Sequence, residues 1–139
     1  MEAMAREKGL DHVRFAGAVG SATVLTVLRH AYMTYIPLVS SDLKDSIPTK
    51  TSEAMGAGCP ILMAAEGDAP ALLAETGFGM NVSPDQIQRL PEVFRQFCGE
   101  YDAILSRREE AMRTAVERHS RQRIAMELEG KLRELLCGK

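Results

Sequence analysis

The stretch TKTSEAMGAGCPILMA, residues 49–64, decides how this chain folds. Residues 49–57 are typical of a helix, and Gly58 is expected to end it, because glycine readily takes the left-handed conformation found at helix C-termini. Pro60 to Ala64 follow as a short apolar run typical of a buried strand. A helix leading directly into a buried strand indicates an α/β protein.

The same alternation continues on both sides of this stretch. Further strands are predicted over 12–17, 32–38 and 79–82, and further helices from Ser21, as a capping residue, and over 69–75. Strands that alternate with helices predict a parallel sheet covered on both faces. Ligands of such sheets bind at the carboxyl ends of strands, beside helix N-termini, and this rule points to the loop 40–50.

The last third of the chain carries helical patterns only, predicted over 86–97, 101–118 and 120–136. The last of these has an apolar stripe, and residues 100–139 hold nine basic and eight acidic residues. Because these charges nearly cancel, a helix packed against the sheet with a solvated outer face is favoured over a basic membrane-surface helix. The stripe consists of Ile124, Leu128, Leu132 and Leu135.

Composition limits the class of protein. The 139 residues suit one domain, and a net charge of −2 gives no indication of a nucleic-acid partner. The three cysteines are widely spaced, without a Cys/His ligand pattern, so we expect free thiols in the cytoplasm and no metal. No apolar run approaches the length of a membrane span.

The loop before residue 49 is the most informative for chemistry. Thr49 is a plausible helix N-cap, and the unpaired amides of the first turn, with the helix dipole, make an anion site. Lys50 adds a cation, Thr49 or Thr51 a hydroxyl, and Glu53 a carboxylate one turn later. Amides for phosphate and a carboxylate for a diol are what a nucleotide site needs.

This loop also resembles a known family. Asp45 and Glu53 have the acidic-x7-acidic spacing of the glycosyltransferase group 1 superfamily, also called family 4, although the first position is more usually Glu. The likeness is closer to the branch that reads Ser-x-Pro-x-Lys-x-x-Glu, here Ser46, Pro48, Lys50 and Glu53. Many members of that branch build bacterial surface polysaccharide.

Other pieces resemble the family in the same order along nearly the whole chain. They are Val13-x-Phe15-x-Gly17, Pro37, the run from Glu53 to Ile61, Glu66-Gly67-Asp68, Gly77-Phe78-Gly79 and His119-Ser120-Arg121. The resemblance implies a Rossmann-like, incomplete C-terminal domain of a GT-B fold over 1–139. Within it, residues 1–85 would be the β/α region and residues 86–139 the helical tail.

The resemblance implies a role for each matching residue. Glu53 would bind the ribose, and Asp45 would contact donor-sugar hydroxyls near the anomeric carbon. Lys50 would support the charge on the departing diphosphate. The backbone of the segment 46–49, comprising Ser46, Ile47, Pro48 and Thr49, would lie near the diphosphate or the sugar.

The sequence assigns no definite role to two further groups of residues. Glu66-Gly67-Asp68 could touch the donor sugar or form a surface turn, with equal weight for both. His12, His30 and His119 have no carboxylate or nucleophile at a telling spacing, so each is expected to be structural or on the surface.

The resemblance also implies that parts of the enzyme are missing. The family domain has six strands in the order 3-2-1-4-5-6, and this sequence matches it only from the helix before the third strand. An absent N-terminal domain would bind the acceptor, which would be a glycan or a lipid-linked sugar. We therefore expect the isolated chain to be inactive. Its unpaired strand edges imply one of three outcomes: poor solubility, a rearranged sheet in which the third strand pairs elsewhere, or association with another copy or with the missing half.

The expected function is transfer of a sugar from a UDP- or GDP-linked donor, without a metal. The full protein would be cytoplasmic, with peripheral attachment to the inner face of the membrane as an option. A non-catalytic remnant or split-gene scaffold module is the main alternative. A UDP-sugar 2-epimerase fragment is a weaker one, because that class lacks the Ser-x-Pro-x-Lys-x-x-Glu motif.

Overall fold

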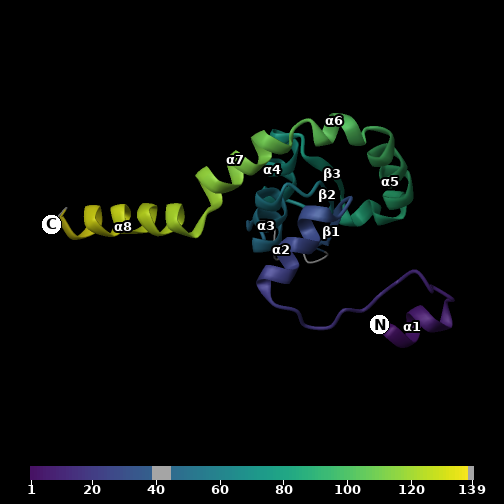
Figure 1. Cartoon of the computed structure of the whole chain (residues 1–139). Helices are drawn as coiled ribbons and strands as arrows, with labels where there is room; N and C mark the ends of the chain where they lie inside the picture. The colour runs from purple at the N-terminus through teal and green to yellow at the C-terminus, as the bar shows by residue number, and fades with distance from the viewer. Residues whose placement is uncertain (39–44, 138–139) are drawn as a thin grey trace.

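The computed structural model describes residues 1–38 and 45–137 and shows a mixed α/β protein that ends in a long helix (Figure 1). Helices and strands alternate from residue 21 to residue 82, and only helices follow in the described residues. The first part contains α1 (Glu2–Glu7), α2 (Ser21–His30), β1 (Thr34–Pro37), α3 (Thr49–Ala57), β2 (Ile61–Ala64), α4 (Asp68–Thr76) and β3 (Gly79–Val82). The second contains the 3-10 helix η2 (Pro84–Arg89), α5 (Leu90–Gly99), α6 (Tyr101–Leu105), α7 (Arg108–His119) and α8 (Arg121–Cys137).

The three strands form one parallel sheet in the order β1-β2-β3. Residue Ile61 of β2 is level with Thr34 of β1 and with Gly79 of β3. All four residues of the central strand β2 are buried, as expected for a strand covered on both faces. The predicted parallel sheet and the strands over 32–38, 60–64 and 79–82 are therefore confirmed.

Two glycines are required where the chain enters β2 and β3. Gly58 ends α3 with a φ of 71°, as the sequence predicted. Gly79 begins β3, and a Cβ atom there would lie 1.9 Å from the carbonyl oxygen of Ile61. No side chain can occupy that space, so the close pairing of β2 with β3 depends on this glycine.

The predicted strand over 12–17 is wrong. These residues form no bridge to any described strand, and Val13 and Phe15 are 40% and 43% exposed. Alternating apolar residues favour a strand only where a neighbouring strand supplies hydrogen bonds, and among the strands that the structure describes β1 pairs with β2 alone. Figure 1 shows α1 and this segment lying apart from the sheet. The cap assigned to Ser21 is also wrong, because Gly20 is the N-cap and Ser21 is already helical.

The core lies between β2, α3, α4 and α7. Helix α3 packs closely on α7, because small residues face each other there: an added Cβ at Gly56 would be 4.0 Å from the Cβ of Ala115. A second contact joins the start of β1 to α5 and α6. In it the rings of Tyr32 and Tyr101 stack with centroids 3.7 Å apart, and Phe97 packs against both.

The helices after β3 are more broken than the sequence predicted. The segment 86–97 is divided between η2 and α5, with a kink at Gln86, and Pro91 lies in the first turn of α5. The predicted helix 101–118 is interrupted between α6 and α7, around Ser106 and Arg107.

Helix α8 projects away from the body of the molecule (Figure 1). Its main contact is with α7, and all of its residues from 121 to 136 are exposed, including Leu132 at 49% and Leu135 at 73%. The prediction that this helix packs against the sheet is therefore wrong. Ser120 separates the two helices, with an extended backbone and a side-chain oxygen that accepts a hydrogen bond from the Arg123 N–H at 3.2 Å.

Candidate functional site

The N-terminus of α3 is formed differently from the sequence prediction. Pro48, not Thr49, is the N-cap, and no side chain in the described part of the chain caps the helix. The Thr51 N–H bonds to the Pro48 carbonyl at 2.8 Å, while the Thr51 side chain is fully buried. Thr49 is exposed as the first helical residue, so its hydroxyl, and not that of Thr51, is available to a ligand.

A pocket of about 400 Å³ lies at this helix terminus, and we call it the junction pocket. One wall comes from Asp45, Ile47, Thr49 and Ser52 around the start of α3, and from Asp68 at the start of α4. The rest of the described lining comes from the junction of α7 and α8, with His119, Arg121 and Ile124. Four residues singled out from the sequence, at positions 45, 47, 49 and 68, therefore meet in one pocket.

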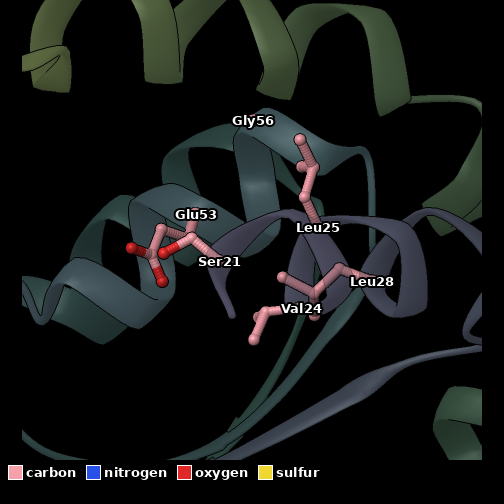
Figure 2. A pocket seen from close by; sticks show the side chains of 6 residues that line it. All are labelled: Ser21, Val24, Leu25, Leu28, Glu53 and Gly56. Carbon is pink, nitrogen blue, oxygen red and sulfur yellow. The ribbon is translucent and has the colours of Figure 1, made fainter. Parts of the chain in front are cut away.

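Glu53 lies in a second pocket, of about 380 Å³, between α2 and α3. We call it the α2–α3 pocket. Figure 2 shows the oxygen-bearing side chains of Glu53 and Ser21 toward one end and the apolar side chains of Val24 and Leu28 toward the other. Leu25 and Gly56 complete its lining. The pocket is thus mainly apolar, with a carboxylate and a hydroxyl at one side.

The two pockets follow neighbouring stripes of α3. Thr49 and Ser52 line the junction pocket, and Glu53 and Gly56 line the α2–α3 pocket. Residues three or four positions apart share a helix face, so Thr49 lies next to Glu53 and Ser52 lies next to Gly56. The span from Thr49 to Gly56 is roughly 10 Å along the helix axis, so one elongated ligand could reach both pockets.

The remaining predicted residues line neither pocket. Ser46 and Lys50 are exposed, and Pro48 is partly buried as the cap of α3. Lys50, in the first turn of α3, places a positive charge beside the junction pocket without lining it. Glu66 and Gly67 precede Asp68 in the loop between β2 and α4 and are likewise outside both pockets.

This loop is held by residues that the sequence did not single out. Asn81 pairs with the backbone of Ala65 twice: its Oδ1 accepts the Ala65 N–H at 3.0 Å, and its Nδ2 donates to the Ala65 carbonyl at 3.1 Å. The Ser83 hydroxyl donates to Glu66 at 3.3 Å. Because Asn81 belongs to β3, the sheet itself fixes where Asp68 begins α4.

His119 is the functional candidate that sequence reasoning missed. It is the last residue of α7 and lines the junction pocket, and its Nε2 is shielded from solvent and has no hydrogen-bond partner among residues 1–38 and 45–137. No local spacing marks it, because it meets residues 45–52 and 68 only through the fold. The one available signal was the resemblance of His119-Ser120-Arg121 to the family, and that resemblance assigned no function to His119.

Other reactive groups offer little additional chemistry. Burial raises the pKa of the Cys59 thiol, while Arg108 acts in the opposite direction, and the residue packs at the start of β2. The part of the chain that the structure describes contains no group of three His, Cys, Asp or Glu side chains arranged to hold a metal ion. Within residues 1–38 and 45–137, none of the helices has the length and apolar character needed to cross a membrane.

Comparisons add no identification. No family model, curated protein sequence or solved structure matches the chain.

Proposed function

We propose that the chain is part of a glycosyltransferase and binds the donor, a nucleotide-linked sugar, across α3. The observation that carries the proposal is the pair of adjoining pockets on this helix, one mainly apolar with Glu53 and one polar with Asp45. The family resemblance of the segment 45–60 supports the same function. In this proposal the three-stranded sheet is part of a Rossmann-like domain.

The nucleoside belongs to the α2–α3 pocket. Val24, Leu25 and Leu28 offer an apolar surface to a planar base, and Glu53 accepts hydrogen bonds from the ribose hydroxyls. Ser21 lies on the same side of the pocket as a further hydrogen-bonding group.

The diphosphate then lies at the N-terminus of α3, between the two pockets. The first-turn amides and the helix dipole favour negative charge there, and Lys50 adds a full positive charge. These groups stabilise the nucleoside diphosphate as the bond to the sugar breaks, which is the main electrostatic task of the transfer. The sugar enters the junction pocket, where Asp45 accepts hydrogen bonds from its hydroxyls.

The acceptor is a glycan or lipid-linked sugar, held by a further domain of the whole enzyme. The proposal places the reaction on the cytoplasmic side, in the synthesis of a surface polysaccharide or glycoconjugate. Both statements rest on the resemblance alone.

Thermal unfolding with UDP, GDP, ADP and their common sugar conjugates tests the donor site. A ligand at 100 times its dissociation constant stabilises the folded chain by about 2.7 kcal/mol, which raises the midpoint by several degrees. We expect one nucleotide series to do so and Glu53→Gln to abolish the shift. Glu109→Gln is the matched control, because this exposed carboxylate on α7 lines neither pocket. A melt that no nucleotide moves would contradict the proposal.

A further inference from the structure

The folded chain exposes more surface than its mass accounts for. A folded monomer of 15.3 kDa exposes roughly 7,100 Å², whereas this chain exposes 9898 Å². The difference of roughly 2,800 Å² exceeds the share of about 800 Å² that each partner contributes to a standard protein–protein interface. Residues 1–20 and 121–136 contain no buried side chain, and both segments project from the body (Figure 1). These two segments are therefore where a partner has surface to cover.

Helix α8 carries a regular apolar seam along its projecting length. Four exposed residues follow one another at spacings of three, four and three, which is the spacing of the a and d positions of a coiled coil. They are Ala125, Leu128, Leu132 and Leu135, and we call them the α8 seam. Because this repeat keeps all four side chains on one side of the helix, a second helix can pack against the whole seam.

A second copy of α8 fits this seam in the antiparallel direction. With the two helices crossing at the level of Gly130, Leu128 faces Leu132 of the second copy, and Ala125 faces Leu135. Each small residue thus meets a large one, which fills the space between the helices. A two-fold axis repeats each contact, as a closed dimer requires.

The parallel direction fits less well. It would place Ala125 opposite Ala125 of the second copy and leave space in the seam. It would also bring Arg121, at the d position before Ala125, opposite the same arginine of the second copy. In the antiparallel pair Arg121 lies beyond the end of the seam, and the two bodies lie at opposite ends of the helix pair.

Charges beside the seam do not decide the pairing. Glu129 and Lys131 flank the seam on its two sides, and the antiparallel pair places each near its counterpart in the second copy. Glu129 is already paired with Arg133 at 2.7 Å within its own helix. Exposed charges at such positions contribute little to association and are screened by salt. The apolar seam therefore supplies the affinity, and added salt should not weaken it.

We propose that α8 is a dimerisation helix, through which two copies of the chain pair antiparallel along the α8 seam. The proposal does not depend on the donor site. The seam spans only roughly 15 Å from Ala125 to Leu135. Such a contact lies at the small end of protein–protein interfaces, so we expect a dissociation constant of about 1–100 µM.

Sedimentation equilibrium of the full chain at concentrations of about 5–500 µM measures the association. We expect a monomer–dimer equilibrium for the wild type. Leu128→Glu and Leu132→Glu should each raise the dissociation constant at least about tenfold, because each places two carboxylates in the apolar seam of the dimer. Both leucines are exposed in the single chain, so neither substitution removes a contact from the folded body.

Met126→Glu is the matched control. Met126 is 58% exposed on the same helix but lies outside the α8 seam, so this substitution adds the same charge and should leave the dissociation constant unchanged. A wild type that stays monomeric over the whole concentration range overturns the proposal. So does an assembly larger than a dimer, or a dimer that Met126→Glu weakens as much as the two seam variants do.

Cysteine cross-linking tests the direction of the helices, in a chain whose native cysteines are replaced by alanine. Oxidised glutathione accepts the electrons of the two thiols that join. In an antiparallel pair, Leu128→Cys and Leu132→Cys chains form a covalent dimer when mixed, because these positions face each other. Neither variant should cross-link alone. Cross-linking of each variant with itself would show a parallel pair and overturn the antiparallel arrangement.

Discussion

Gly58 turns the chain from α3 into β2 with a φ of 71°, and its surroundings leave little space. A Cβ atom there would lie 3.1 Å from the Met112 Sδ and 3.2 Å from carbons of Arg108. We therefore expect Gly58→Ala to lower the free energy of unfolding by about 1–2 kcal/mol from backbone strain alone. Urea denaturation measures the loss.

Gly130→Ala is the control for this substitution. Gly130 lies inside α8 with nothing within 4 Å of an added Cβ atom. Alanine is favoured there by up to about 1 kcal/mol, so helicity should rise instead of falling. Equal effects of the two substitutions would show that the left-handed conformation of Gly58 does not matter.

Asn81 gives a prediction that joins stability to the candidate site. Replacing it with alanine leaves the N–H and carbonyl of Ala65 without their partner, at a cost of about 1–3 kcal/mol. Because these bonds fix the loop before Asp68, we also expect weaker binding of the sugar conjugate. Urea denaturation and calorimetric titration measure the two effects. Ser83→Ala is the comparison with the smaller expected effect, since it removes a single hydrogen bond of 3.3 Å to Glu66. Similar losses of stability and of affinity in the two variants would contradict the role given to Asn81.

At the scale of single residues, the sequence predicted which residues lie at the candidate site better than it predicted the residues that they contact. The segment 45–49 and Asp68 were singled out, and four of their residues meet in one pocket. Thr49 as a cap was wrong, because the extended Pro48 already precedes the helix. His119 and Asn81 were missed because their partners are distant in the sequence, and no local spacing can indicate such contacts.

Ser120 decides the geometry between the last two helices. Its side chain caps α8 through the Arg123 N–H, and Ser120→Ala should destabilise the first turn of α8 by about 0.5–2 kcal/mol. Amide hydrogen exchange should therefore quicken at Arg123 while the core amides are unaffected. Ser120→Asn should restore protection, since asparagine caps equally well. Ser106→Ala is the control, because that hydroxyl bonds back to the Ala103 carbonyl and caps no following helix; the same exchange pattern there would refute the capping role.

Among the elements, those with local signals were predicted well. Residues 49–57 form α3 and residues 79–82 form β3 with the predicted limits, because glycines mark their ends. The strand over 12–17 failed because a strand is defined by its neighbour, which a sequence pattern does not show. The packing of α8 failed for the same reason: its stripe indicates a helix face but not what covers that face.

The whole molecule divides into a packed body and a loosely attached beginning. Residues 1–20 contain no buried side chain, and Val13, Phe15 and Val19 are all exposed. Removal of residues 1–19 should therefore change the free energy of unfolding by no more than about 0.5 kcal/mol. Binding of a hydrophobic dye should fall, because exposed apolar area is lost.

Urea denaturation and dye fluorescence of the shortened chain measure both effects. Removal of α8 after Ser120 is the comparison, since it should leave the body folded and remove only Arg121 and Ile124 from the lining of the junction pocket. A large loss of stability on removing residues 1–19 would mean that this segment packs against the sheet in solution.

The stacked rings of Tyr32 and Tyr101 have an optical consequence. The chain has no tryptophan, so its near-ultraviolet circular dichroism comes largely from tyrosine, and this close pair belongs to the body. The far-ultraviolet signal is dominated by helices and includes the projecting α8. Heating curves at the two wavelengths therefore observe different parts of one chain. If the two curves coincide, the body and α8 unfold as one unit. If the far-ultraviolet signal is lost first, α8 unfolds while the tyrosine pair is still intact.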